Sequence, residues 1–166
     1  MKTFGLWALV FVLAAVLALV TFANSTAAKG NTPFVAIATA NGGRPFTTTL
    51  LGANEFPGPG DPDGTGTARV TLNPGQGEVC YDITVANIAL PATGAHIHEG
   101  VAGTAGPIRV NFVPPDATGH TSGCVQNVPR ERIQDIIQNP EKYYVNVHST
   151  QFPPGAVRGQ LSRGNP

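Results

Sequence analysis

The sequence predicts an all-β domain, built as an antiparallel sandwich or barrel with one short helix near residues 129–139. Three observations lead to this fold class. Short runs in which apolar and polar residues alternate recur along the chain, as expected for half-buried strands. Clusters of turn residues separate these runs, and 20 glycines and 15 prolines supply them. Hydrophobic residues make up 42% of the 166 residues, which suits one domain with one packed core.

The first three predicted strands lie within residues 47–88. The run TTTLLGANEF opens the domain, and the turn-rich stretch PGPGDPDGTG follows it. In TARVTLN every second residue from Ala68 to Leu72 is apolar, so these side chains share one face of a strand. The turn PGQG then leads into EVCYDITVANI, where the alternate residues from Val79 to Val85 share a face. Two alternating runs joined by a Pro-Gly turn indicate a hairpin.

The second half of the domain adds more strands and the helix. The runs GAHIHEG and IRVNFV flank a Gly-rich loop at 101–107. Residues 114–123 are expected to form a loop, with a new short strand that begins at Cys124. In PRERIQDIIQNP three isoleucines fall on one helical stripe, Pro129 suits the first turn and Pro140 ends the helix. The runs KYYVNVHS and AVRGQLS are expected to close the domain as two strands.

Residues 1–28 have the order of a secretory signal peptide. A basic residue precedes the apolar run FGLWALVFVLAAVLALVTFA, and small residues follow, with Ala28 suited to the position before the cleavage site. The apolar run is about as long as a bilayer core requires, so an uncleaved anchor spanning residues 4–23 is the alternative. Both interpretations place the rest of the chain outside the cytoplasm, as a secreted, periplasmic or cell-surface protein.

The remainder divides into a linker and the β-domain. Residues 29–46 are expected to connect the signal to the fold, with one short strand at 34–39, and the domain covers residues 47–163. Over the whole chain ten basic residues balance ten acidic ones. Because nucleic-acid binding needs a basic patch, nucleic acid is excluded as a partner.

Export decides how the two cysteines are interpreted. Cys80 and Cys124 are the only cysteines of the chain. Two cysteines in an oxidising compartment usually pair, so we predict a structural disulfide between them. The alternative is a reactive thiol, which would need an electropositive setting that neither neighbourhood shows.

Three histidines are candidate metal ligands. His96 and His98 are two residues apart in a strand, so their side chains project to the same face. His148 lies in a second strand, whose aliphatic residues take the opposite face. If the two strands are neighbours, the three imidazoles converge outside the core, at a separation of roughly 3–4 Å between ring nitrogens. Three imidazoles with an open fourth position suit copper or zinc.

The fourth ligand and the metal itself are open at this stage. Glu99 lies at the end of the His-X-His strand, and Asp116 and His120 lie in a later loop, so each is a candidate fourth ligand. The alternative is purely structural histidines that form hydrogen bonds to loop carbonyls. His-X-His alone is a weak motif, and no other cofactor is predicted.

Two isolated charged residues are further candidates, but the sequence contains no catalytic motif. Glu55 in GANEFPG and Arg158 in GAVRGQL are predicted to form a structural ion pair between the first and last strands. Tyr143 is expected in the core and Tyr144 at its rim. The sequence contains no nucleophile motif, reactive cysteine or phosphate-binding glycine loop, so no catalytic residue is predicted.

Four separated motifs occur in the order LLGANEFPG, GTGTARVTL, GAHIHEGVAGTAGPIRV and YYVNVHSTQFPPGAVRGQL. Together they resemble the CHRD domain, a module named for chordin that also occurs singly in exported microbial proteins. The resemblance covers about residues 47–163 and implies an immunoglobulin-like, Greek-key sandwich or barrel. It implies little chemistry. In chordin the module belongs to an extracellular antagonist that binds growth factors, and this chain lacks the cysteine-rich repeats that accompany it there.

Two hypotheses for function follow. The first is a non-catalytic exported β-domain that acts as a binding module for an unidentified extracellular or envelope protein or ligand. The second is a mononuclear copper or zinc protein that uses His96, His98 and His148. The tract HIHE also looks like a copper-ligand stretch of copper–zinc superoxide dismutases, but the rest of that ligand set is not visible. Dismutase-like and cupin-like chemistry therefore rank below both hypotheses.

Overall fold

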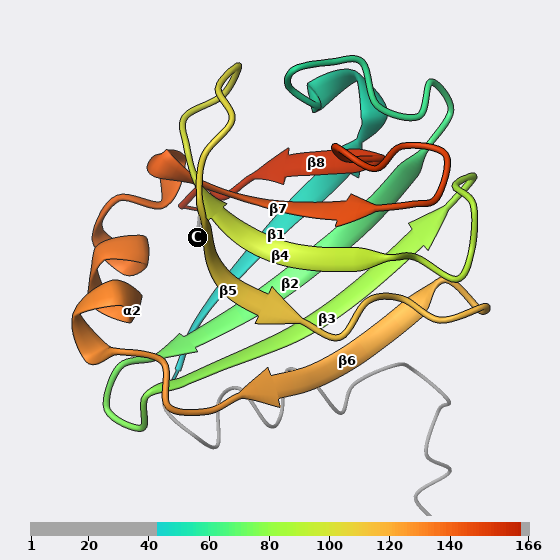
Figure 1. The fold of residues 1–166 in the computed structure, drawn as a ribbon. Coiled ribbons are helices and arrows are strands. Elements are labelled where there is room, and N and C mark those ends of the chain that lie inside the picture. Colours follow the sequence, from blue (N-terminus) through green and yellow to red (C-terminus); the bar gives the residue numbers. More distant parts are fainter. Residues whose placement is uncertain (1–42, 164–166) are drawn as a thin grey trace, which may run out of the picture. The chain divides into compact units, whose positions relative to one another are not determined.

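The computed structural model describes residues 43–163, which form eight strands, one α-helix and two short 3-10 helices (Figure 1). The elements are β1 Arg44–Leu51, η1 Gly52–Asn54, β2 Thr65–Asn73, β3 Glu78–Ala86, β4 Gly94–Glu99, β5 Ile108–Phe112, β6 His120–Val125, α2 Arg130–Gln138, η2 Pro140–Lys142, β7 Tyr143–His148 and β8 Val157–Gln160.

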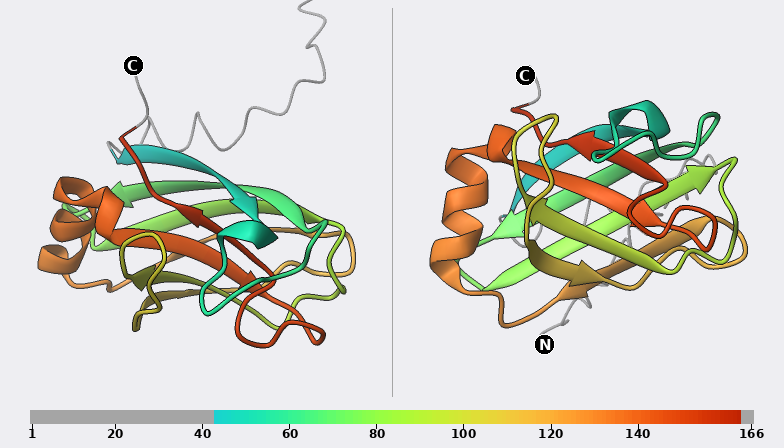
Figure 2. Two further views of the ribbon diagram at one scale, coloured as in Figure 1. Left: turned by 90° about the horizontal axis from the view of Figure 1, so that it is seen from above. Right: turned by 45° about the horizontal axis from the view of Figure 1, so that its top comes forward.

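All eight strands belong to one antiparallel sheet, in the order β5-β4-β7-β8-β1-β2-β3-β6. The sheet curls until its edge strands β5 and β6 approach each other, which makes a nearly closed barrel or sandwich (Figures 1 and 2). The predicted all-β fold class is therefore confirmed. The order also shows crossovers, since β4 pairs with β7 and β1 pairs with β8.

The inner face of the sheet carries the core that the alternation predicts. Ala68, Val70 and Leu72 of β2 are buried, and so are the alternate residues from Val79 to Val85 of β3. These two strands pair in register as the predicted hairpin. On the other side of the barrel the core is completed by Ala95, Ile97, Val145, Val147, Val157 and Leu161. Burying this apolar surface is the main favourable contribution to folding.

The helix α2 closes one end of the barrel (Figure 2). It begins directly after Pro129 and ends before Pro140, as the sequence predicts. Ile133 and Ile136 are buried in the core, while Ile137 packs at its margin. The helix is thus held by its apolar stripe.

The structure corrects three local predictions. The strand β6 begins at His120 and not at Cys124, because pairing with β3 draws residues 120–123 out of the expected loop. The strand β1 begins at Arg44, inside the expected linker 29–46. Tyr144 is only 3% exposed and does not lie at a rim. The remaining N-terminal predictions, including the signal, the anchor and the strand at 34–39, concern residues outside the described range. Within that range no helix is long and apolar enough to cross a bilayer.

The predicted disulfide joins β3 to the edge strand β6. Cys80 and Cys124 face each other in the register of these strands and their sulfur atoms are bonded. Neither cysteine is therefore available as a metal ligand.

Candidate metal centre

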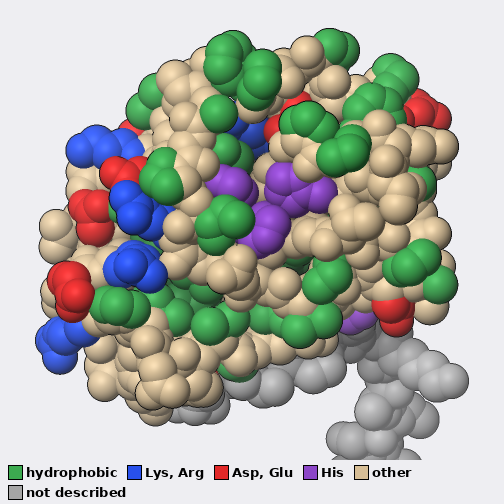
Figure 3. All heavy atoms as spheres, in the orientation of Figure 1, with side chains coloured by type: hydrophobic (Ala, Val, Ile, Leu, Met, Phe, Trp, Pro, Cys, Tyr) green, Lys and Arg blue, Asp and Glu red, His purple; other side chains and the backbone are tan. Residues whose placement is uncertain are grey.

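The strands β4 and β7 are neighbours, which brings the three candidate histidines together. Their antiparallel register pairs His96 with Asn146 and Gly94 with His148. As the period-two alternation predicts, all three imidazoles lie on the outer face of this part of the sheet, because Ile97 and Val147 point into the core. Figure 3 shows histidine side chains gathered in a hollow on one face of the molecule.

The ring nitrogens approach each other closely. His96 Nδ1 lies 3.1 Å from His148 Nε2. One ligand atom from each of the three histidines lies within 4.8 Å of the corresponding atoms of the other two. Nitrogens that are each about 2 Å from a shared ion lie roughly 3–4 Å apart, so the cluster needs little rearrangement to hold one.

Two loops set the tautomers of these rings. His98 Nδ1 donates a hydrogen bond to the carbonyl of Gly106 at 2.8 Å, and His148 Nδ1 donates one to the carbonyl of Pro153 at 2.9 Å. A neutral imidazole has one donor and one acceptor nitrogen, so Nε2 of each of these rings carries the lone pair. Metal-binding histidines typically have such a carbonyl partner on the second ring nitrogen, because it orients the ring and raises its basicity.

The Nε2 atom of His98 has no hydrogen-bond partner, although it is buried. A buried polar atom without a partner costs about 1–3 kcal/mol, so natural proteins rarely leave one. Nε2 of His148 instead accepts the hydrogen bond from His96 Nδ1. A cation in the cluster would use the lone pair of His98 and replace the bond between the other two rings.

All three rings are held in the neutral form that a metal requires. Burial, together with the neighbouring His148 and His98, lowers the pKa of His96 to about 4. Burial also lowers the pKa of His98 and that of His148 below the ordinary value. Because the unshifted pKa of histidine is near 6.5, the cluster is uncharged at pH 7.

The three candidate fourth ligands lie elsewhere. His120 is exposed and contacts Asp82, with Nε2 3.3 Å from Oδ1. The carboxylate of Asp116 accepts hydrogen bonds from the backbone and side chain of Thr118. Glu99 contacts Arg109 at 2.5 Å. Among residues 43–163 the cluster therefore consists of the three histidines alone, and a fourth ligand would come from solvent.

A layer of polar side chains extends the site across β7 and β8. The ring of Tyr144 stacks on that of His98, with centroids 4.9 Å apart and planes at 6°. The guanidinium carbon of Arg158 lies 3.4 Å from the centroid of the same tyrosine ring. Since β7 lies between β4 and β8 in the sheet, Tyr144 separates the histidine from the arginine.

Arg158 and Gln160 hold the loop 100–107 over this layer. The Arg158 guanidinium donates to the carbonyls of Thr104 and Val101, at 2.7 and 2.9 Å. The amide of Gln160 donates to the carbonyl of Gly100 at 2.8 Å. Because Gly106 in the same loop accepts the hydrogen bond from His98, these contacts also position that ring.

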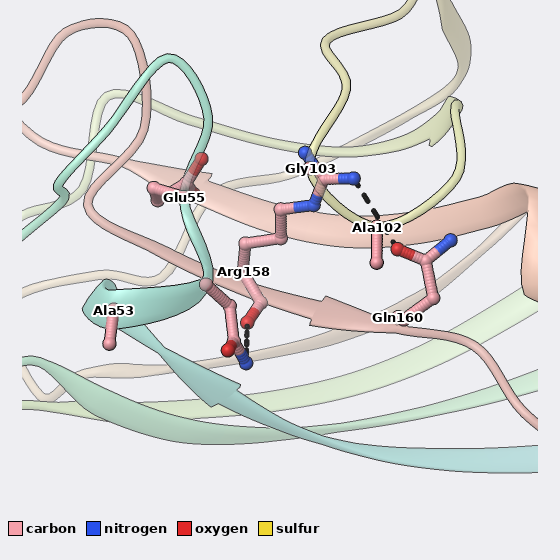
Figure 4. A pocket seen from close by; sticks show the side chains of 7 residues that line it. Ala53, Glu55, Ala102, Gly103, Arg158 and Gln160 are labelled. Atoms are coloured by element: carbon pink, nitrogen blue, oxygen red, sulfur yellow. Dashed lines mark hydrogen bonds between the residues drawn. The ribbon is translucent and has the colours of Figure 1, made fainter.

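Glu55 and Arg158 lie at one cavity but not in direct contact. No ion pair joins them among the described residues, so the predicted clamp is not formed as a contact. They line a cavity of about 320 Å³ together with Asn54, Ala102 and Gln160 (Figure 4). Burial raises the pKa of Glu55 to about 7, although the charge of Arg158 acts to lower it. Oε1 of this carboxyl has no hydrogen-bond partner.

The comparison with protein families agrees with this architecture. The family model of the CHRD domain matches residues 46–161, from β1 to the residue that follows β8. The chain belongs to the CHRD-domain family. Neither the curated proteins nor the solved structures include a match to this chain. The family thus accounts for the β-domain and leaves its activity open.

Sequence reasoning missed two glycines that shape the site of this CHRD domain. A Cβ at Gly94 would lie 3.0 Å from His96 Cε1 and 3.3 Å from His148 Cδ2, so glycine leaves room for both rings. A Cβ at Gly106 would lie 1.6 Å from the carbonyl oxygen of Glu99, so only glycine allows this close approach. Gly94 directly precedes the AHIH tract, and this position in the sequence could have indicated that it lies beside the histidines.

Proposed function

We propose that this CHRD domain is an exported metal-binding domain that holds one copper or zinc ion with His96, His98 and His148. The supporting observation is the convergence of three neutral imidazoles, in which Nε2 of His98 is buried without a partner. Imidazole suits both ions, and carbonyl groups orient two of the three rings. Purely structural histidines would leave that nitrogen unexplained.

The proposed role is binding and not catalysis. No nucleophile or acid–base pair accompanies the cluster among the described side chains, and the polar residues beside it hold loops in place. When bound, copper would add one-electron chemistry and zinc would add Lewis acidity. The chain itself contributes neutral donors, fixed ring orientations and one side that faces solvent.

Metal content of the full chain tests the proposal. Protein purified from a metal-replete culture should contain about one equivalent of copper or zinc by elemental analysis. The His98→Ala variant should contain less than about a tenth of an equivalent. The matched control His120→Ala removes a histidine outside the cluster and should keep the wild-type content. Less than about a tenth of an equivalent in folded wild-type protein would refute the metal site.

Export is the second part of the proposal, supported by the signal-like order of residues 1–28. The mass of the protein recovered from cells should correspond to a chain that begins at Lys29. Recovery of the full-length chain from membranes would instead support the anchor at residues 4–23. Recovery from the cytosol would contradict both.

The cavity beside Arg158 supports a second candidate function, the binding of a small polar ligand. It is lined by the guanidinium of Arg158 and the buried carboxyl of Glu55, which suits a zwitterion such as a free amino acid. Calorimetric titration with glycine and with glutamate should show binding that Glu55→Gln weakens at least fivefold. Absence of heat at millimolar concentrations of both amino acids would exclude this candidate and leave the metal proposal untouched.

A further inference from the structure

We propose that the three-histidine centre binds copper in preference to zinc and favours Cu(I) over Cu(II), because Arg158 places a buried positive charge beside a neutral ligand set. The inference rests on the proposed metal site and names its ion and oxidation state. It follows from three features: the charge of the ligands, the stack that leads from Arg158 to His98, and the incomplete neutralisation of that arginine.

The ligands contribute no negative charge. Three imidazoles are neutral donors, and no carboxylate belongs to the cluster among the described residues. Glu99, which follows His98 directly, forms an ion pair with Arg109, with Oε2 of the glutamate 2.5 Å from Nη2 of the arginine. A centre of this kind therefore has the full charge of its ion, +1 for Cu(I) and +2 for Cu(II) or Zn(II).

The guanidinium of Arg158 lies close to the ligand set through one intervening ring. It stacks 3.4 Å from the centroid of Tyr144, whose other neighbour is the parallel ring of His98 at 4.9 Å. Arg158 is 1% exposed, so bulk water screens its charge poorly. Guanidinium remains protonated in proteins, and the positive charge is therefore permanent.

The positive charge of Arg158 is not neutralised by a contact. Its hydrogen bonds go to the neutral carbonyls of Thr104 and Val101 and to the side chain of Gln160. Glu55 faces the same cavity but forms no ion pair with it (Figure 4). Burial raises the pKa of that carboxyl to about 7, so its negative charge is incomplete at neutral pH.

The consequence is electrostatic. A fixed cation repels a doubly charged ion more strongly than a singly charged one at the same place, by an amount that grows as screening falls. For the couple Cu(II) + e⁻ ⇌ Cu(I), with the electron supplied by an external reductant, Arg158 raises the reduction potential. The same repulsion acts on Zn(II), because that ion also carries two positive charges.

The test compares Arg158→Gln, which removes the charge, with Arg158→Lys, which keeps it and loses the forked hydrogen bonds. The full chain is loaded with copper, and the potential is measured by redox titration monitored by electron paramagnetic resonance. We expect Arg158→Gln to reduce the preference for Cu(I) about tenfold, which is about 59 mV for a one-electron couple. Arg158→Lys should retain most of the wild-type potential. Arg69→Gln, on the solvent-facing side of β2, is the matched control and should change nothing.

Several results would overturn the inference. An unchanged potential in Arg158→Gln would do so, and so would equal losses in the Gln and Lys variants, since loop positioning would then be the cause. If Arg158→Gln does not fold, competition titrations on wild-type protein still decide. Zinc that displaces Cu(I) at equal concentration would refute the preference while leaving the metal site intact. Failure of every ion to bind would instead refute the proposed function.

Discussion

The outer faces of the two halves of the sheet differ in what covers them. On β2 and β3 the outward residues Thr67, Arg69 and Thr84 are exposed to solvent, although the outward pair Thr71 and Cys80 further along these strands is buried. On β7 and β8 the outward residues Tyr144 and Arg158 are only 3% and 1% exposed. Both halves follow the same period-two alternation, so strand geometry alone does not account for the difference.

The loops account for it. Residues 100–107 lie over β7 and β8, held there by hydrogen bonds from Arg158 and Gln160. The loop 149–156 reaches back to His148 through the carbonyl of Pro153. A polar face that is covered must satisfy its groups internally. The comparison teaches that the covered half holds a site where one buried and two half-buried histidines are neutral and convergent. In the solvated half His120 is exposed and contacts only Asp82.

The largest expected effect concerns the solvated half of the sheet, where the disulfide joins β3 to the edge strand β6. The Cys80→Ala/Cys124→Ala double variant opens a loop of 44 residues, which should cost up to about 4 kcal/mol of unfolding free energy in the chain-entropy model. Urea unfolding measures the loss. Hydrogen exchange should increase mainly at β6, and metal content should stay at the wild-type level. Faster exchange at β4 and β7 than at β6 would show that the two halves are not independent.

A similar effect is expected in the covered half when its buried cation is removed. Arg158→Met leaves the carbonyls of Thr104 and Val101 without donors, and hydrogen bonds from charged groups contribute about 1.5–3 kcal/mol each. We expect a loss of about 3 kcal/mol in urea unfolding. Arg69→Met, on the exposed face, should cost less than about 0.5 kcal/mol. Equal losses in the two variants would remove the distinction between the halves.

Metal binding should stabilise the fold through the covered half only. At a free ion concentration 100 times the dissociation constant, the unfolding free energy should rise by about 2.7 kcal/mol. Thermal unfolding with and without chelator measures this gain. It should persist in His120→Ala and vanish in His98→Ala. A gain that survives in His98→Ala would place the ion elsewhere.

The smallest effect is a pH dependence in which two groups of the covered half act with opposite signs. The folded-state pKa of His96, about 4, is below its unfolded value, so the unfolded chain binds more protons between pH 4 and 6.5. Its contribution is complete above pH 6.5 and is lost as the pH falls. For Glu55, with a pKa raised to about 7, the folded chain binds more protons, and stability falls as the pH rises from 4.5 to 7.

Urea unfolding of the metal-free protein at pH 7 and pH 5 separates these contributions. His96→Asn should reduce the loss of stability on acidification, because asparagine at this position cannot take up a proton on unfolding. Glu55→Gln should increase that loss, because the opposing contribution disappears. The opposite order of the two variants would contradict the assigned pKa shifts.

Much of the site was predictable, up to the point where non-local pairing enters. The alternation in AHIH and YYVNVH places all three histidines opposite the aliphatic core, and the structure confirms it. The fourth-ligand candidates lie outside the three-histidine cluster, because proximity in sequence or loop character does not determine which strands are neighbours. His120 belongs to β6, at the far edge of the sheet order from β4.

Tyr144 illustrates the other limit. Its outward position follows from the alternation, but its burial depends on a loop forty residues earlier in the chain, which the pattern of β7 does not encode. The ion pair expected between Glu55 and Arg158 failed for the same reason: the carbonyls of that loop take the hydrogen bonds of the guanidinium.

The sequence by itself determined the all-β class, the short helix between two prolines, the pairing of the two cysteines and the face on which each histidine lies. These features depend on periods of two or 3.6 residues, on local turn chemistry and on a single pair of thiols. Only the tertiary structure decided that β4 lies beside β7, that two loops cover this half of the sheet and that Arg158 stacks on Tyr144. Several of these contacts join residues far apart in the sequence, such as Arg158 and Thr104 at a separation of 54. Their free energy depends on the whole packed arrangement and not on any one segment.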